Sequence, residues 1–144
     1  MCIHIRKSKF YISRRSEKVI FSNVDCVSFY VENLDDGITF YSKLLGLKLL
    51  WRASNSCGLG LENDITEVVL VTEHNPVVQF KVDSVESALD RFLKAGGTLV
   101  YGPFDIDIGK CAVVKDKWEN QFCILDMSKG KYTVDNNGNV TGVM

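Results

Sequence analysis

Cysteine has the most varied chemistry of any residue type in this sequence, because a thiolate is both a nucleophile and a metal ligand. The chain has five cysteines, an odd number with no CxxC pair and no regular spacing. This pattern argues against a disulfide framework or a zinc ribbon. Three of the cysteines lie in apolar, strand-like runs, where a free thiol usually packs as a small hydrophobic group. We expect all five to be reduced: Cys2, Cys26, Cys57, Cys111 and Cys123.

Few other residues combine a reactive side chain with an activating neighbour. His74 lies in the polar segment Glu73-His74-Asn75-Pro76, which predicts an exposed turn rather than a metal ligand. Lys81 and Tyr30 are candidates for proton transfer if they are buried. No general base with an evident partner is found, so the sequence assigns no catalytic residue and leaves open whether the protein is an enzyme.

Charge and hydropathy limit the classes of partner. The chain has 17 basic and 18 acidic residues and a net charge of −1, so no overall field attracts nucleic acid or an anionic membrane. No apolar run approaches the roughly 20 residues that span a bilayer, and no secretory signal is recognised. We therefore expect a cytoplasmic protein. Residues 1–21 are basic and predict an arm, either solvated or in contact with an acidic partner.

The elements that must position these residues follow a βαβββ pattern in the first half of the chain. Residues 24–31 are rich in β-formers, and Asn33 supplies an N-cap. Apolar residues then recur at helical spacing up to Leu45, with Gly46 just beyond the expected helix end. Strand-like segments follow at residues 47–52, 58–62 and 67–72.

The second half of the chain repeats this pattern. Residues 29–35, FYVENLD, realign without a gap on residues 80–86, FKVDSVE, 51 positions later, and Gly46 falls on Gly97. Strands are expected at residues 98–101, 111–115 and 121–127. The sequence therefore predicts one α+β domain over residues 22–128, made of tandem βαβββ modules 22–74 and 75–128. A polar C-terminal tail, 129–144, either forms a short hairpin or stays unstructured.

Three segments carry a family resemblance: residues 25–31, DCVSFYV; residues 40–47, FYSKLLGL; and residues 113–120, VVKDKWEN. Together they resemble the vicinal oxygen chelate superfamily, which contains glyoxalases, bleomycin resistance proteins and extradiol dioxygenases. The resemblance covers roughly residues 23–129. It implies that the two modules form a curved mixed sheet with helices on the outside. Because this superfamily contains lyases, dioxygenases, thiol transferases, epimerases and metal-free antibiotic-binding proteins, the fold alone does not fix the function.

The resemblance also implies where a metal would bind. Its four ligand positions fall on Cys26, on Val77, on Leu70 or a neighbour, and on Cys123. None of these has an imidazole or carboxylate, and two are aliphatic, so we predict that the usual metal site is lost and expect no cofactor. The alternative is a soft metal ion held by Cys26 and Cys123.

A ligand pocket follows if the ligand positions face the concave side of the sheet. Strand alternation then predicts which neighbours share that side, and the two tryptophans are candidates for aromatic walls. The predicted pocket residues are Cys26, Ser28, Tyr30, Trp51, Leu70, Thr72, Val77, Gln79, Lys81, Trp118, Cys123 and Leu125.

These features favour a protein that binds or sequesters a partly apolar small organic molecule, such as an antibiotic, as a homodimer that shares pocket walls. The alternative is a glyoxalase-like enzyme, a lyase, isomerase or thiol transferase, with a non-standard metal site. An interaction module that uses the basic arm is a third hypothesis.

Overall fold

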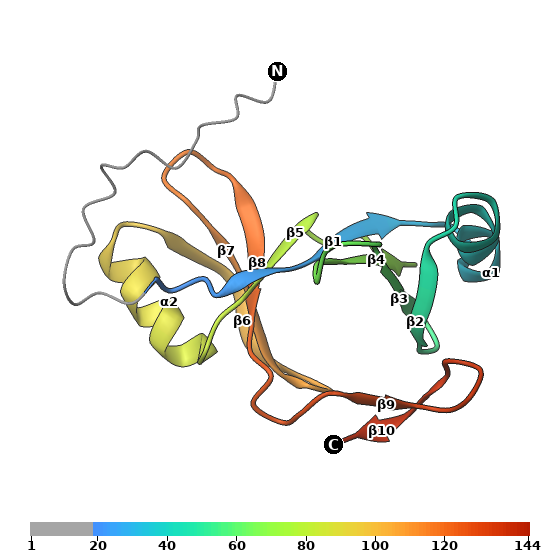
Figure 1. The fold of residues 1–144 in the computed structure, drawn as a ribbon. Helices are drawn as coiled ribbons and strands as arrows, with labels where there is room; N and C mark the ends of the chain where they lie inside the picture. Colours follow the sequence, from blue (N-terminus) through green and yellow to red (C-terminus); the bar gives the residue numbers. More distant parts are fainter. Residues whose placement is uncertain (1–18) are drawn as a thin grey trace, which may run out of the picture.

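A curved, eight-stranded mixed sheet dominates the structure, a computed structural model that describes residues 19–144 (Figure 1). The helices lie at the two outer sides of this sheet, and a C-terminal hairpin lies on its inner side. The α+β fold expected from the sequence is confirmed. The predicted basic arm, residues 1–21, lies outside the described residues except for 19–21.

The first module contains β1 (Asn23–Tyr30), α1 (Leu34–Ile38), β2 (Lys48–Arg52), β3 (Ser56–Gly60) and β4 (Glu67–Val71). Helix α1 continues directly into a π-helical segment, η1 (Thr39–Leu44). The Asn33 side chain caps the helix by accepting a hydrogen bond of 3.0 Å from the backbone N–H of Asp36. Gly46 ends it with a φ of +85°, a backbone conformation that favours glycine.

The second module contains β5 (Val78–Lys81), α2 (Val85–Lys94), β6 (Thr98–Ile106), β7 (Gly109–Lys115) and β8 (Gln121–Leu125). Ser84 caps α2 as Asn33 caps α1, by accepting a hydrogen bond from the backbone N–H of Ser87. No helix in residues 19–144 has both the length and the apolar character needed to cross a membrane.

The strand order, β2-β3-β4-β1-β5-β8-β7-β6, is the same in each module when read outward from the centre. The central pair β1 and β5 is antiparallel, whereas β1 pairs in parallel with β4 and β5 pairs in parallel with β8. Two equivalent modules therefore meet edge to edge, as the internal repeat predicts.

Apolar residues pack on both faces of the sheet. On the outer face, α1 packs on a cluster that includes Leu59 and Leu70, and α2 packs on one that includes Val114 and Ile124. Phe21 stacks on Phe80 with ring centroids 4.5 Å apart and joins the α2 side of the core. The inner face has smaller clusters built around Cys26 and Cys123, which leave room for a cavity.

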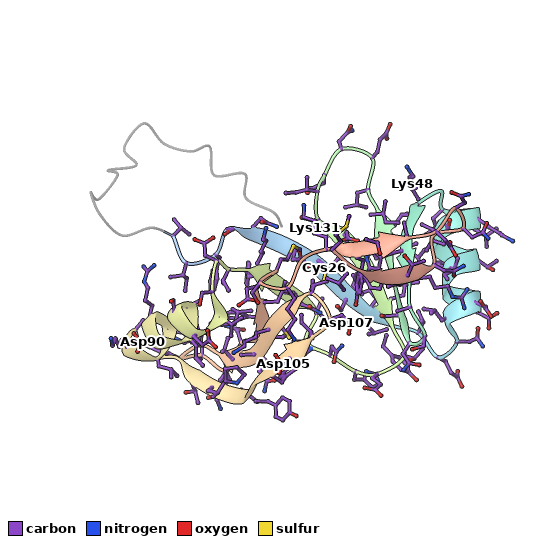
Figure 2. All side chains as sticks on the ribbon, turned by 90° about the horizontal axis from the view of Figure 1, so that it is seen from below. Cys26, Lys48, Asp90, Asp105, Asp107 and Lys131 are labelled. Carbon is purple, nitrogen blue, oxygen red and sulfur yellow. The ribbon has the colours of Figure 1, made fainter. Side chains whose placement is uncertain are left out.

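The tail beyond β8 forms the hairpin of β9 (Tyr132–Val134) and β10 (Val140–Val143). It crosses from the second module to the first, where the backbone N–H of Arg52 donates a hydrogen bond of 2.8 Å to the carbonyl of Gly138. Viewed from below, the hairpin lies across the inner side of the sheet, with Lys131 at its start (Figure 2). The hairpin alternative predicted for this tail is the one that the structure shows.

Candidate functional site

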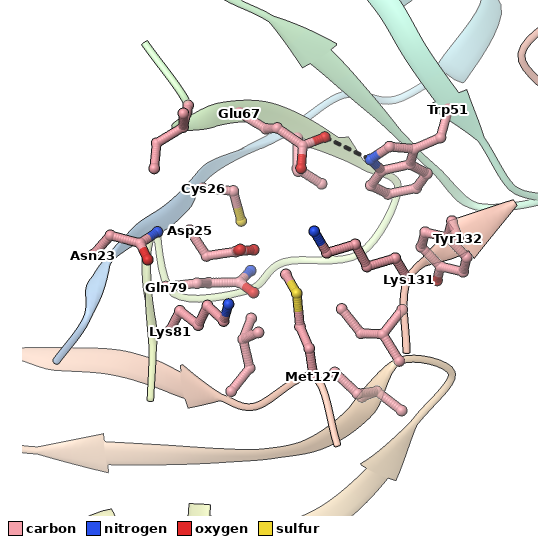
Figure 3. A pocket seen from close by; sticks show the side chains of 15 residues that line it. Asn23, Asp25, Cys26, Trp51, Glu67, Gln79, Lys81, Met127, Lys131 and Tyr132 are labelled. Atoms are coloured by element: carbon pink, nitrogen blue, oxygen red, sulfur yellow. Dashed lines mark hydrogen bonds between the residues drawn. The ribbon is translucent and has the colours of Figure 1, made fainter. Parts of the chain in front are cut away.

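A cavity of about 560 Å³ lies between the inner face of the sheet and the C-terminal hairpin. Both modules contribute to its wall, and the side chains turn into a common space (Figure 3). Its lining residues are Asn23, Asp25, Cys26, Trp51, Ile65, Glu67, Val69, Gln79, Lys81, Ile106, Ile108, Leu125, Met127, Lys131 and Tyr132.

Strand β1 presents two consecutive residues, Asp25 and Cys26, to this cavity. A regular strand cannot do so, because successive side chains point to opposite faces. The pairing of β1 with β5 explains the exception: Val24 pairs with Phe80 and Cys26 pairs with Gln79, so Asp25 is an extra residue in a β-bulge. Bulges of this kind redirect a side chain, and here the bulge adds a carboxylate to the cavity.

Strand β4 contributes a second carboxylate next to Cys26. Cys26 pairs with Glu67 in the parallel ladder between β1 and β4, so both side chains are on the inner face. The indole Nε1 of Trp51 donates a hydrogen bond of 2.7 Å to Glu67 Oε1, which fixes the direction of the carboxylate. A Cβ atom at Gly58 would overlap the indole ring, so the absence of a side chain at that position makes this contact possible.

Strand β5 supplies an amide and an ammonium group. Gln79 Nε2 donates a hydrogen bond of 2.7 Å to the hydroxyl of Ser28, which lies buried under the cavity wall. Lys81 is two residues further along the same face and reaches into the cavity (Figure 3). The amide is held in place, whereas the ammonium group has no ion pair within the described part of the chain.

Burial shifts the titration of both acids. It raises the pKa of Asp25, and the positive charge of Lys81 offsets part of that effect. It also raises the pKa of Glu67, against the opposing effect of the hydrogen bond from Trp51 and with a further contribution from the negative charge of Asp25. Both carboxylates are therefore easier to protonate than exposed ones, so both are suited to exchange protons or to meet a cation.

The hairpin supplies the fourth side of the cavity through Lys131 and Tyr132. Tyr132 packs on Trp51 with ring centroids 5.0 Å apart, and its hydroxyl donates a hydrogen bond of 3.2 Å to Asp107 Oδ2. Lys131 is held by backbone hydrogen bonds to and from Met144, and its ammonium group points into the cavity (Figure 3). The tail therefore anchors on both modules and adds a cation to the site.

The buried thiols differ in how easily they ionise. Burial, reinforced by the negative charge of Asp25, raises the pKa of Cys26 to about 12. A hydrogen bond with Cys123, together with burial, raises the pKa of Cys111. Cys26 therefore stays a protonated thiol near neutral pH and is a weak nucleophile, whereas the hydrogen bond from Cys111 lowers the pKa of Cys123.

The positions that the superfamily uses for metal do not fit a metal ion in this chain. Ser28 and Gln79 are equivalent residues of the two modules, 51 positions apart. Gln79 pairs with Cys123, a ligand position of the second module, and Ser28 pairs with Val69. Val69 is therefore the neighbour of Leu70 that takes the equivalent ligand position in the first module. Val69 has no donor atom, nor does Val77, which is 52% exposed. Within residues 19–144, no three His, Cys, Asp or Glu side chains are grouped so as to hold a metal ion.

The structure brings five of the predicted pocket residues to the cavity wall: Cys26, Trp51, Gln79, Lys81 and Leu125. Two more, Ser28 and Cys123, are buried beside this wall. Whether any of them contacts a ligand stays a prediction.

The other five predicted residues lie elsewhere. The predicted facing pattern of β4 is wrong by one residue. Leu70 packs in the α1 cluster, and Glu67 and Val69 face inward instead. Thr72 lies past the end of β4 and donates a hydrogen bond to the carbonyl of Asn55. The remaining three are exposed at the surface. Tyr30 stacks on His74, Val77 lies just before β5, and Trp118 lies in the turn after β7.

Sequence reasoning did not assign the other ten lining residues to the pocket: Asn23, Asp25, Ile65, Glu67, Val69, Ile106, Ile108, Met127, Lys131 and Tyr132. A bulge inserts one residue without changing the composition of a strand, so alternation alone cannot place Asp25. The hairpin had a usable signal, since Asp135-Asn136-Asn137-Gly138 is a turn sequence between two β-rich segments. Nothing in that signal says which surface the hairpin covers.

Comparisons with known proteins agree with the fold. The profile of the family described as "Glyoxalase/Bleomycin resistance protein/Dioxygenase superfamily" matches residues 23–124. A search of curated proteins found no significant match.

Similar solved structures share the fold at low sequence identity. Methylmalonyl-CoA epimerase from Mycobacterium tuberculosis has a TM-score of 0.64 and 15% identity, over 80% of this chain and 94% of that one. A structure titled NAD-dependent benzaldehyde dehydrogenase from Legionella pneumophila has a TM-score of 0.60 and 20% identity, over 72% and 98%. An extradiol ring-cleaving dioxygenase from B. fuscum has a TM-score of 0.54 and 16% identity, over 74% of this chain and 33% of that one.

Proposed function

Because the chain belongs to the glyoxalase/bleomycin resistance protein/dioxygenase superfamily, we propose that it binds a small, partly apolar organic molecule in the cavity of its curved sheet. The observation that supports this proposal is the cavity itself, whose volume of about 560 Å³ is in the range of small-molecule sites. It has polar groups on the β1, β4 and β5 side and aliphatic side chains on the opposite side, including Ile106 and Ile108.

This division fits a ligand with one polar end and one apolar end. Ile106, Ile108 and Met127 offer a surface on which apolar area is removed from water, at about 25 cal/mol per Å². The fixed amide of Gln79 and the carboxylates of Asp25 and Glu67 orient the polar end. The proposal needs no metal, because aliphatic residues stand at two of the four ligand positions.

Chemical-shift mapping tests the proposal. A library of small aromatic and aliphatic fragments is added to ¹⁵N-labelled protein, and the indole N–H of Trp51 is followed as a reporter inside the cavity. The indole N–H of Trp118, whose side chain is 78% exposed, is the matched control. We expect fragments to shift the resonances of Trp51 and Met127 and to leave Trp118 unchanged, with the same affinity before and after chelator treatment. No shift at the cavity, or shifts only elsewhere, refutes binding at this site.

A second candidate function is proton transfer, and the position of Glu67 favours it. Its carboxylate faces the cavity, is oriented by Trp51 and has a raised pKa, all of which suit a general base for a C–H bond of the ligand. Incubation of carbon acids with the protein in D₂O, followed by mass spectrometry, measures such exchange. We expect Glu67→Gln to abolish any exchange and Glu62→Gln, at an exposed site outside the cavity, to retain it. Exchange that survives in Glu67→Gln excludes this role.

Antibiotic sequestration is one specific form of the binding proposal, and thermal-shift screening of antibiotics tests it with the same protein. The homodimer and the cytoplasmic location expected from the sequence stay predictions.

A further inference from the structure

Four charged side chains line the cavity, and they come from four separate places in the fold. Asp25 lies in β1, Glu67 in β4, Lys81 in β5, and Lys131 immediately before β9. None of the four forms an ion pair with another charged residue in the described part of the chain, although other lysines and acids on the surface do pair.

The two carboxylates lie on one side of the cavity, around Cys26. Asp25 precedes Cys26 in the bulge, and Glu67 is the cross-strand partner of Cys26, so their negative charges are close enough to raise the pKa of Glu67. Trp51 satisfies only one oxygen of Glu67. Lys81 is the cation that acts on Asp25 here, but the two carboxylates outnumber it, so this side of the cavity keeps a net negative charge that attracts an ammonium group.

The most prominent cation lies on the opposite wall. Lys131 enters from the hairpin side, and its nitrogen turns toward the space between Trp51, Cys26 and Met127 (Figure 3). Its backbone is fixed by hydrogen bonds with Met144, at 3.1 Å from the N–H of Lys131 and 2.9 Å to its carbonyl. The ammonium group is thus presented by an ordered segment and lacks a counterion within residues 19–144.

Opposite charges that share a partly buried space and remain unpaired are unfavourable unless something else neutralises them. A ligand with a single charge neutralises the charge of only one wall. A ligand with both charges compensates both walls at once, and its apolar part then meets Ile106 and Ile108.

We propose that the cavity takes a small zwitterion, whose ammonium group lies between Asp25 and Glu67, whose carboxylate lies against Lys131, and whose apolar side chain packs on the isoleucines of the β6–β7 turn. A hydrophobic amino acid is the simplest molecule of this class. The inference rests on the proposed binding function and adds the chemical class of the ligand.

The test compares molecules that share one apolar body and differ only in charge. For the phenyl series these are phenylalanine (zwitterion), 3-phenylpropanoate (anion), phenethylamine (cation) and 3-phenylpropanamide (neutral). The leucine and tryptophan series are built in the same way to vary the size of the body. Dissociation constants are measured by calorimetry, and the Trp51 indole resonance shows whether binding occurs in the cavity.

We expect the zwitterion of at least one series to bind roughly tenfold or more tightly than its singly charged analogues, because each end makes a charge-assisted contact. Lys131→Met should weaken binding of the zwitterion and the anion and leave the cation unchanged. Asp25→Asn should weaken binding of the zwitterion and the cation and leave the anion unchanged. Lys48→Met, at an exposed site in β2, is the matched control and should change nothing (Figure 2).

The two proposals fail in different ways. If neutral or singly charged analogues bind in the cavity as tightly as the zwitterions, or if both cavity variants bind all four molecules like the wild type, the zwitterion proposal is wrong and ligand binding stands. If no molecule of any series shifts the Trp51 resonance, both proposals are refuted. Both variants remove charge at wall positions outside the closely packed clusters, and a wild-type ¹⁵N spectrum confirms that each one folds.

Discussion

Trp51 and Glu67 are joined by a hydrogen bond of 2.7 Å, and both side chains lie against the backbone of Gly58. The register explains this contact, since Gly58 pairs with Trp51 on one side and with Val69 on the other. The cavity wall at this point depends on a position without a side chain, and the first prediction concerns that position.

Gly58→Ala should displace the indole ring, because its new methyl group would occupy the same space. We expect a loss of about 1–3 kcal/mol in the free energy of unfolding, as for other overpacked sites, together with a changed Trp51 emission in a Trp118→Phe background. Urea denaturation and fluorescence measure both effects. Gly142→Ala is the control, because its Cβ meets only Thr133 Oγ1 at 3.5 Å. Wild-type stability and emission in Gly58→Ala contradict the described packing.

The free energy of unfolding of Glu67→Gln should increase relative to that of the wild type as the pH rises. Burial raises the pKa of Glu67 above 4.5, so the stability that its protonated form provides is present below pH 4.5 and is lost as the pH rises through the folded-state pKa. Glutamine keeps an acceptor for the Trp51 indole and carries no charge. The free energies of unfolding of the two proteins, measured from pH 4 to pH 7, should diverge in favour of the variant. Glu62→Gln should show no such trend, and parallel curves for Glu67→Gln contradict the raised pKa.

Cys26 should react slowly with iodoacetamide in the folded protein. With a pKa of about 12, roughly one Cys26 thiol in ten thousand is ionised at pH 8, and the thiolate is the reactive form. Labelling followed by peptide mass spectrometry separates Cys26 from the other cysteines. The same peptide in urea provides the unfolded reference rate. Native labelling at the reference rate is the outcome that contradicts this prediction.

Tyr132 should keep its proton until the pH reaches about 12, because burial and the negative charge of Asp107 both raise its pKa. The contribution of this raised pKa to stability is complete below pH 10 and is lost as the pH rises from 10 to 12. Absorbance at 295 nm, compared between the wild type and Tyr132→Phe, isolates this transition. Asp107→Asn should lower the pH at which Tyr132 ionises. Asp105→Asn should not, because Asp105 pairs with Lys129 instead. A difference between wild type and Tyr132→Phe with its midpoint near pH 10 contradicts the anchoring of the hairpin by Tyr132.

Asp126→Ala should destabilise the second module strongly. The Asp126 carboxylate is 2% exposed and accepts hydrogen bonds from the backbone N–H groups of Val85, Lys110 and Ser128 and from the Ser128 hydroxyl. We expect a loss of about 2–4 kcal/mol, because buried donors lose their acceptor. These bonds lower the pKa of Asp126, so the wild type should lose this stabilisation as the pH falls below 3.8 and should approach the variant there.

Urea denaturation at pH 7 and at pH 3 measures the difference. The exposed Asp90→Ala, which removes an i,i+4 pair with Lys94, provides the reference for a surface acid and should lose less than about 1 kcal/mol. An equal, small loss in both variants at pH 7 would show that Asp126 has no special structural role.

The fold could be predicted from the sequence because its signals are redundant. The match of residues 29–35 with residues 80–86, the N-cap expected at Asn33, and the alignment of Gly46 with Gly97 all indicate the same two modules. Each signal depends on local backbone geometry, which neighbouring residues determine.

The site could be predicted only in part, because it depends on single-residue shifts. Cys26, Gln79 and Lys81 were placed correctly on the inner face, since β1 and β5 alternate regularly beyond the bulge. Asp25 and Glu67 were not, because one extra residue in β1 and a one-residue shift in β4 reverse the face that a side chain occupies. These two acids are the only carboxylates among the lining residues of the cavity.

The hairpin also sets an order of events during synthesis. Both modules precede it in the chain, so the sheet can form before β9 and β10 leave the ribosome, at typical rates of roughly 5–20 residues per second. Until they do, Trp51 lacks its Tyr132 partner and the inner face of the sheet is uncovered. While β9 and β10 are absent, the future ligand cavity is an open groove whose sheet wall carries Asp25, Glu67 and Lys81, and docking of the hairpin turns that groove into a cavity.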